Sequence, residues 1–270
     1  MKKTKVIIPA LGILLLSTAA SVTGTVAWFT TNNSVSASTM TVHAVVSGNL
    51  FIKEGNSATL DQINAVSASL TTTATSLSPV DVIADGTVGA KLQIPDVYST
   101  SPTVGGAGTV STYKAVTGSS ITPTSATGET GYVLVDYVSI ANKQTNASTF
   151  PLHPTVEVEV HSDDLLAKAL RAGIVIAQFD GSLGAATYYE SGDAAISTKT
   201  VGEGESAVTK TYATLDFNNG ENPYPSALND NKIYRVALML WFEGDDGDCF
   251  VNNAQHLGNC VASWTFSSAA

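Results

Sequence analysis

The strict alternation of apolar and polar residues over positions 154–162 constrains the fold more than any other feature of this sequence. One face of an extended chain would carry Val156, Val158 and Val160, and the other would carry Glu157, Glu159 and His161. Successive side chains of a strand point to opposite faces, so this pattern predicts a half-buried strand of an antiparallel sheet. Apolar runs at 132–140, 174–177, 233–242 and 261–266 predict further strands. We therefore expect an all-β, mainly antiparallel protein, a jelly-roll or immunoglobulin-like β-sandwich.

The composition agrees with this fold class and excludes several others. Only 13% of the residues are charged, 22 are glycine, and Ser and Thr are abundant, which favours strands and turns over helical bundles or coiled coils. The net charge of −10 offers nothing to neutralise a run of phosphates, so we expect no nucleic-acid partner. Because 44% of the residues are hydrophobic, the chain is not disordered throughout.

We expect residues 47–270 to form a single β-sandwich domain with one or two short helices. Leu60, Ile63 and Val66 have helical spacing, which predicts a short helix within 59–70. A second short helix is predicted over 163–170, where two aspartates would suit the positive end of the helix dipole. Residues 95–131 are rich in Gly, Pro, Ser and Thr and predict a turn-rich excursion, either a long surface segment or a set of short hairpins.

The N-terminus has the features of a secretory signal peptide. Lys2, Lys3 and Lys5 precede an uncharged stretch over 6–29, with small residues near Ala27. We expect residues 1–27 to be a signal peptide and the protein to be secreted, at the cell surface or in the extracellular matrix. The alternative is an uncleaved anchor, because the stretch is long enough to span a bilayer. With the signal peptide cleaved, we expect the protein to contact the membrane only as its uncleaved precursor.

The two cysteines, Cys249 and Cys260, lie close together near the C-terminus. In an oxidising compartment such a pair most simply forms a disulfide that closes a small loop. A metal site built on them is the weaker alternative, because only His256 lies between them and the sequence has no second pair of soft ligands.

No motif in the sequence supports catalysis, and we predict a protein that is not an enzyme, with no catalytic residues. His153 and His161 flank the two glutamates of the alternating strand and could form a metal-binding stripe. Eight residues of strand separate the two histidines by about 26 Å, too far to share one ion. A solvated strand face is the alternative.

Four carboxylates immediately before the first cysteine form a candidate calcium site, although no cofactor is required by the sequence. They are Glu243, Asp245, Asp246 and Asp248. Ca²⁺ needs clustered oxygen ligands on a flexible loop, and Gly244 and Gly247 would allow the turns. The spacing does not match an EF-hand loop, and an acidic solvated turn is the alternative.

Two stretches resemble the TasA/camelysin family of exported proteins. The first is Gly24-Thr25-Val26-Ala27-Trp28-Phe29-Thr30, which follows the apolar stretch and precedes a strand rich in small residues. The second is the run from Arg235 to Asp245, followed by Cys249, which is similar to a stretch in surface proteins with comparable leaders. The resemblance implies cleavage by a specialised signal peptidase and a mature protein that begins at Trp28. The protease activity associated with camelysin is not carried over, because no zinc-protease motif is present.

The family implies a jelly-roll subunit that polymerises head to tail into fibres of the biofilm matrix, so the partners would be other copies of this chain. In that family an N-terminal strand inserts into the sheet of the next subunit. Residues 28–46 are the candidate donor strand, and its apolar positions are Trp28, Phe29, Met40, Val42, Ala44 and Val46. The alternative is that this segment pairs within its own sheet.

The sequence thus predicts a structural subunit that assembles into fibres by donor-strand complementation. An extracellular adhesin that binds surface glycans through residues 95–131 is the alternative. A secreted hydrolase with an unrecognised site is a third and weaker hypothesis.

Overall fold

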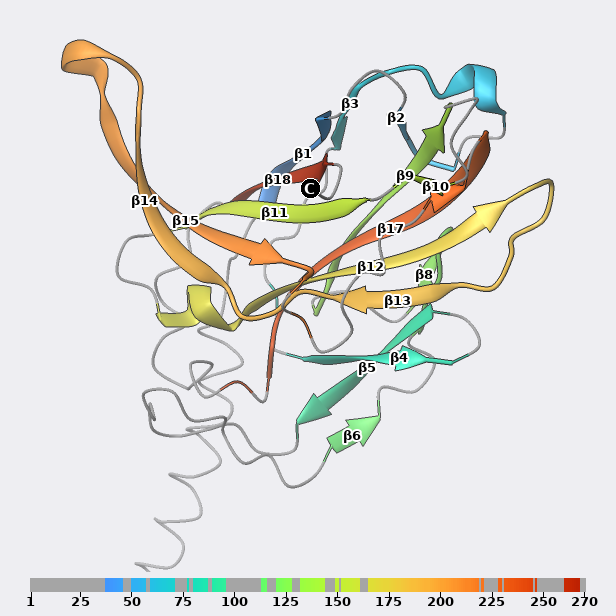
Figure 1. Cartoon of the computed structure of the whole chain (residues 1–270). Helices are drawn as coiled ribbons and strands as arrows, with labels where there is room; N and C mark the ends of the chain where they lie inside the picture. Colours follow the sequence, from blue (N-terminus) through green and yellow to red (C-terminus); the bar gives the residue numbers. More distant parts are fainter. Residues whose placement is uncertain are drawn as a thin grey trace, which may run out of the picture.

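The computed structural model shows three packed layers of β-sheet (Figure 1). It describes residues 37–45, 50–56, 59–70, 77, 80–86, 89–95, 113–115, 120–127, 132–143, 149–150, 152–160, 165–218, 220, 228–229, 231–244, 246 and 260–267. The predicted leader lies outside these residues. Among the described residues no helix is long and apolar enough to span a membrane.

The first layer, here called the outer sheet, has six strands. Their order is β14 (Ala195–Val201), β15 (Val208–Asp216), β11 (His153–Val160), β18 (Cys260–Ser267), β1 (Ala37–Val45) and β3 (Ser67–Leu70). The predicted alternation of β11 is confirmed, because every second residue of this strand is buried. Neighbouring strands run antiparallel except for β1 and β18, which are parallel.

The second layer, the central sheet, has five antiparallel strands. Their order is β13 (Thr187–Glu190), β12 (Leu170–Phe179), β17 (Lys232–Phe242), β9 (Leu134–Asn142) and β2 (Leu50–Glu54). Most of β12 and β17 is buried without alternation, which is the pattern of strands covered on both faces.

The third layer covers the second face of the central sheet. It is a small sheet of β4 (Asp81–Asp85), β5 (Gly89–Pro95), β6 (Tyr113–Ala115), β7 (Ser120–Ile121) and β8 (Ala126–Thr127). A separate pair is formed by β10 (Thr149–Phe150) and β16 (Leu228–Asn229). The described part of the turn-rich region 95–131 therefore contributes short strands to a structural layer.

Two hydrophobic cores hold the three layers together. Between the outer and central sheets lie the buried valines of β11 and the buried side chains of β18, with Val138, Ile140 and Leu238 from the central sheet. Between the central and small sheets lie Val82, Leu92 and Ile121, packed with residues that include Val175 and Trp241. Side chains of β12 and β17 alternate between the two cores, which explains why most residues of both strands are apolar, apart from a few such as Arg171 and Arg235.

The fold class is confirmed as all-β and mainly antiparallel, with short 3-10 helices among the described residues. The helix predicted over 163–170 is present as the 3-10 helix Leu165–Ala169, whereas the one predicted within 59–70 is reduced to Leu60–Gln62. Within 59–70 the chain forms a single 3-10 turn (Leu60–Gln62) and then the strand β3, because long-range pairing with β1 overrides the local helical spacing. Val66, which the helix would have buried, is 59% exposed. At the second site a 3-10 turn (Leu165–Ala169) leads directly into β12.

Candidate functional site

The edge of β18 that pairs with β1 is the candidate site for strand exchange. On its other edge β18 pairs antiparallel with β11. Ala262, Trp264 and Phe266 of β18 are buried in the core between the outer and central sheets, and the Trp264 and Phe217 ring centroids lie 6.0 Å apart. The strand that pairs with β18 therefore completes a sheet over the largest buried aromatic group of this core.

The register of β1 matches the predicted donor strand. Met40, Val42 and Ala44 lie level with Ala262, Trp264 and Phe266, respectively, in the parallel ladder. On its other edge β1 pairs antiparallel with β3, with Met40 level with Leu70. Three of the predicted donor positions thus lie directly beside the three buried residues of β18 in the sheet.

In this single chain β1, the described part of the segment 28–46, pairs within its own sheet, as the alternative to donor-strand insertion predicted. The boundary expected between a donor strand and the domain at 46/47 is therefore not a structural boundary here, because β1 is an inner strand of the outer sheet. Trp28, Phe29 and Val46 lie outside the described residues.

The polar face of β11 carries ion pairs with the neighbouring strands. Glu157 accepts a hydrogen bond from Lys199 of β14, and Glu159 accepts one from Lys210 of β15 at 2.8 Å. These half-exposed pairs offset the negative charge of the strand but contribute little stability each. His161 lies outside the described residues, so the structure does not test the candidate metal-binding stripe of His153 and His161.

His153 lies at the opposite end of β11 in a small polar cluster. Its Nε2 is 2.9 Å from Asp216 Oδ1 and 2.8 Å from Asn218 Nδ2, and the Asn218 backbone N–H also donates to Asp216 Oδ1. Partial burial would raise the pKa of Asp216, but the hydrogen bonds from His153 and from the Asn218 backbone outweigh burial and lower it.

Replacing Asp216 with asparagine is expected to remove a stability contribution that depends on pH. Folding lowers the pKa of Asp216, so its contribution is complete above the ordinary carboxyl pKa of about 3.9. It is then lost as the pH falls through the lower pKa of the folded protein. In urea unfolding, the difference in free energy between the parent and the variant should therefore shrink below about pH 3.9.

The matched control is Asp61→Asn, because Asp61 is exposed and lies on the first 3-10 turn, remote in sequence from Asp216. Its difference from the parent protein should stay small across the same pH range. A difference for Asp216→Asn that persists unchanged in acid would contradict the assigned role.

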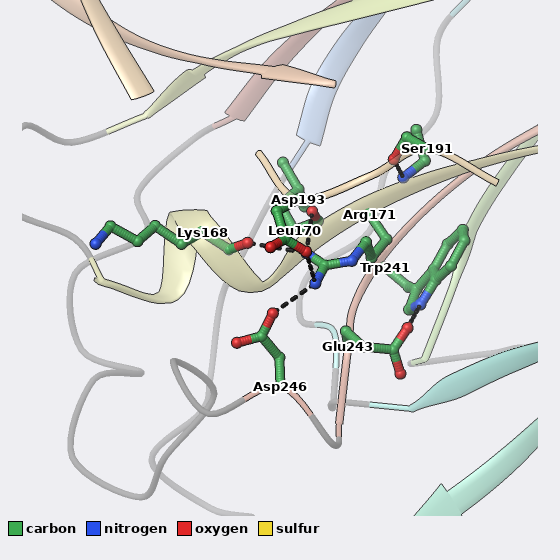
Figure 2. Close-up of polar contacts among 9 residues, drawn as sticks. Lys168, Leu170, Arg171, Ser191, Asp193, Trp241, Glu243 and Asp246 are labelled. Carbon is green, nitrogen blue, oxygen red and sulfur yellow. Dashed lines mark hydrogen bonds and ion pairs between the residues drawn. The ribbon is translucent and has the colours of Figure 1, made fainter. Parts of the chain in front are cut away.

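Arg171 is the centre of the most buried ionic cluster among the described residues (Figure 2). Its Nη2 lies 2.7 Å from Asp193 Oδ1 and 2.5 Å from Asp246 Oδ2. Its Nη1 donates to the backbone carbonyls of Lys168 and Leu170 at 2.9 Å and 3.0 Å. The guanidinium therefore ties the start of β12 to the chain beyond β17.

Charges around Arg171 differ in exposure, and this decides which of them matters. The Asp193 side chain is 87% exposed, whereas that of Asp246 is only 14% exposed. Burial alone would lower the pKa of Arg171, but Asp246, Asp193 and Glu243 overcome this effect and raise it. Arg171 therefore stays charged, and its principal partner is the Asp246 carboxylate, which is much less exposed than that of Asp193.

Of the four predicted calcium ligands, the structure describes Glu243 and Asp246. Glu243 Oε2 accepts a hydrogen bond of 2.9 Å from the Trp241 indole N–H, and Asp246 is paired with Arg171. Asp245 and Asp248 lie outside the described residues. Among described residues no group of three or more His, Cys, Asp or Glu side chains is arranged to hold a metal ion. Calcium binding stays a prediction.

The predicted disulfide also stays a prediction. Cys260 is the first residue of β18, whereas Cys249 lies outside the described residues. The segment that the disulfide would close therefore ends where β18 begins.

Sequence reasoning missed Arg171 and Asp193 as members of a polar cluster. The available signal was an arginine within the apolar run that begins at Leu170, where an unpaired charge would be costly. Its partner Asp246 is 75 positions away along the chain. Nothing in the sequence identifies which carboxylate meets the arginine.

The chain has no significant match to any protein-family model, to any curated protein or to any solved structure.

Proposed function

We propose that this protein is a secreted structural subunit that assembles head to tail into extracellular or cell-surface fibres. In this assembly β1 of one copy takes the place of β1 beside β18 of the next copy. The observation that carries the proposal is the parallel pairing of β1 with the buried, aromatic strand β18. The apolar leader expected from the sequence supports secretion.

The position of β1 makes such an exchange possible without threading the chain. β1 is the first described strand, and residues 46–49 connect it to β2, which belongs to the central sheet. Rotation about this short connection would move β1 to another copy and leave the rest of the fold in place. Repetition of this head-to-tail contact produces an open fibre.

The pairing of β1 with β18 is the same in the closed monomer and in the fibre, so the protein concentration determines which of the two forms is favoured. The eight residue pairs of β1 with β18 are the same within one chain and between two chains. A short connection gives the intramolecular strand an effective concentration in the millimolar range. We therefore expect assembly at high local concentration, or where additional contacts between copies favour it.

A mixture of two variants, each with one introduced cysteine, is expected to report the exchange directly. Thr41 of β1 and Ser263 of β18 are register partners. If strands exchange, Thr41→Cys and Ser263→Cys proteins assembled together should form a disulfide-linked pair under mild oxidation, seen on non-reducing gels. Neither variant can form the bond between positions 41 and 263 within its own chain. Negative-stain microscopy of the same sample should show fibres.

The matched control replaces Ser263→Cys with Thr265→Cys, which is two positions out of register with Thr41 and should cross-link much more weakly. Unmodified protein controls for the native cysteines. A chain lacking residues 28–46 should give neither cross-links nor fibres. Fibres formed by that truncated chain, or equal cross-linking by both pairs, would contradict the proposal.

A further inference from the structure

The β14–β15 hairpin projects from the sandwich and carries an exposed sheet edge (Figure 1). β14 is the last strand of the outer sheet on the side opposite to β3, and among the described strands it pairs with β15 alone. All seven residues of β14 are exposed. The edge is therefore long and accessible, and its far end projects from the body of the molecule, although β14 also contacts the 3-10 helix Leu165–Ala169.

This hairpin also concentrates exposed apolar side chains. Three of the five large hydrophobic residues exposed in the described chain are Ile196, Val201 and Val208, at 39%, 44% and 55%. Val201 and Val208 are register partners near the tip. A long edge with apolar side chains is a template for pairing with another strand.

The usual protection of such an edge is missing. Sheet edges are commonly guarded by charged side chains, especially lysine, or by proline. β14 contains one charged residue, Lys199, and no proline. Lys199 lies over the Tyr212 ring, 5.1 Å from its centroid, and pairs with Glu157 two strands away. Its charge is thus drawn over the face of the sheet and does not guard the edge.

We infer that β14 is a self-association edge, which pairs antiparallel with β14 of a second copy about a twofold axis. A second copy is the occupant that fits, because it presents an edge of equal length on an equally projecting hairpin. With the axis at Thr198, the middle residue of the strand, Lys199 of each copy lies opposite Ser197 of the other. The two lysines therefore avoid direct opposition, which would be destabilising.

This contact differs from strand exchange in its symmetry and in the edge that it uses. An isologous contact closes after two copies, whereas the exchange of β1 continues without limit. The β14 edge also lies at the far side of the outer sheet from the β1–β3 pair. Within a fibre it would join subunits laterally, and it does not require β1 to exchange.

A single cysteine at Thr198 is expected to cross-link two copies, because this residue faces its own counterpart across the twofold axis. Under mild oxidation Thr198→Cys should give at least about tenfold more disulfide-linked dimer than Thr209→Cys. Thr209 is also exposed, and it lies on β15 of the same hairpin, which β14 covers on the side of the proposed contact. The Thr198→Cys yield should rise with protein concentration.

A second variant tests the edge without oxidation. Thr198→Lys places two positive charges opposite each other at the axis, and it should weaken self-association in sedimentation by up to about fivefold, whereas Thr209→Lys should not. Equal cross-linking at positions 198 and 209, or unchanged association of Thr198→Lys, would overturn the inference. The Thr41/Ser263 cross-link reports β1 exchange separately, so either contact can fail while the other stands.

Discussion

Replacing Arg171 with methionine is expected to lower the free energy of unfolding by about 3–5 kcal/mol. The substitution keeps most of the side-chain length but leaves the Asp246 carboxylate, only 14% exposed, without its guanidinium partner. The backbone carbonyls of Lys168 and Leu170 also lose their donors. Chemical denaturation at neutral pH measures this loss, which would be a large fraction of the about 5–15 kcal/mol available to a typical domain.

Two further variants separate the buried pair from the exposed one. Asp193→Asn removes an ion pair in which the carboxylate is exposed, so it should cost less than about 1 kcal/mol. The double variant Arg171→Met with Asp246→Leu removes both buried charges and should recover much of the lost stability. If Arg171→Met costs no more than Asp193→Asn, the cluster does not stabilise the fold in this way.

Replacing Gly89 with alanine is expected to destabilise the protein by about 3 kcal/mol, through backbone strain and overpacking together. Gly89 has a φ of +133°, a conformation that residues with a side chain rarely adopt. A Cβ atom there would overlap the carbonyl oxygen of Ile121 and lie 2.6 Å from Val175 Cγ1. Because Gly89 begins β5, the expected result is a small sheet that detaches from the central sheet.

Gly86→Ala is the matched control, because this glycine lies just beyond β4, close to Gly89 in the sequence, and a Cβ atom there would meet nothing within 4 Å. Denaturation should show little change for Gly86→Ala. Binding of a hydrophobic dye should increase for Gly89→Ala, since the core that includes Val82, Leu92 and Trp241 would become accessible. Similar stability of the two variants would show that close packing at Gly89 is unimportant.

The strands that the sequence predicted best are those whose pattern reflects local burial. β11 alternates because one face meets the core and the other meets lysines, and both features follow from the period of an extended chain. The apolar runs of β12 and β17 also predicted strands. Their lack of alternation indicates that side chains on both faces of the central sheet are buried, and the third layer covers one of these faces. A run of apolar residues, however, does not identify which part of the chain covers the strand.

The features that sequence reasoning missed depend on contacts between distant segments. Ile63 is buried as the helical spacing required, yet Ala65 pairs with Ile52 and the chain continues as β3. The same limit applies to the candidate site: the apolar positions of β1 were recognised, but their register against β18 is a property of pairing between remote segments.

The pairing of β1 with β18 has a consequence for how the chain acquires its structure during synthesis. These are the first and the last described strands, so the outer sheet cannot be completed until the chain has been synthesised through β18. At about 5–20 residues per second, β1 waits on the order of ten seconds or more for its partner strand. Sheets that depend on such remote pairing also fold slowly once the chain is complete. In that interval the edge of β1 that pairs with β18 is open in each new chain and can meet the β18 of a neighbour. Under the proposed exchange, the rate of synthesis and the crowding of nascent chains would influence how many copies close on themselves.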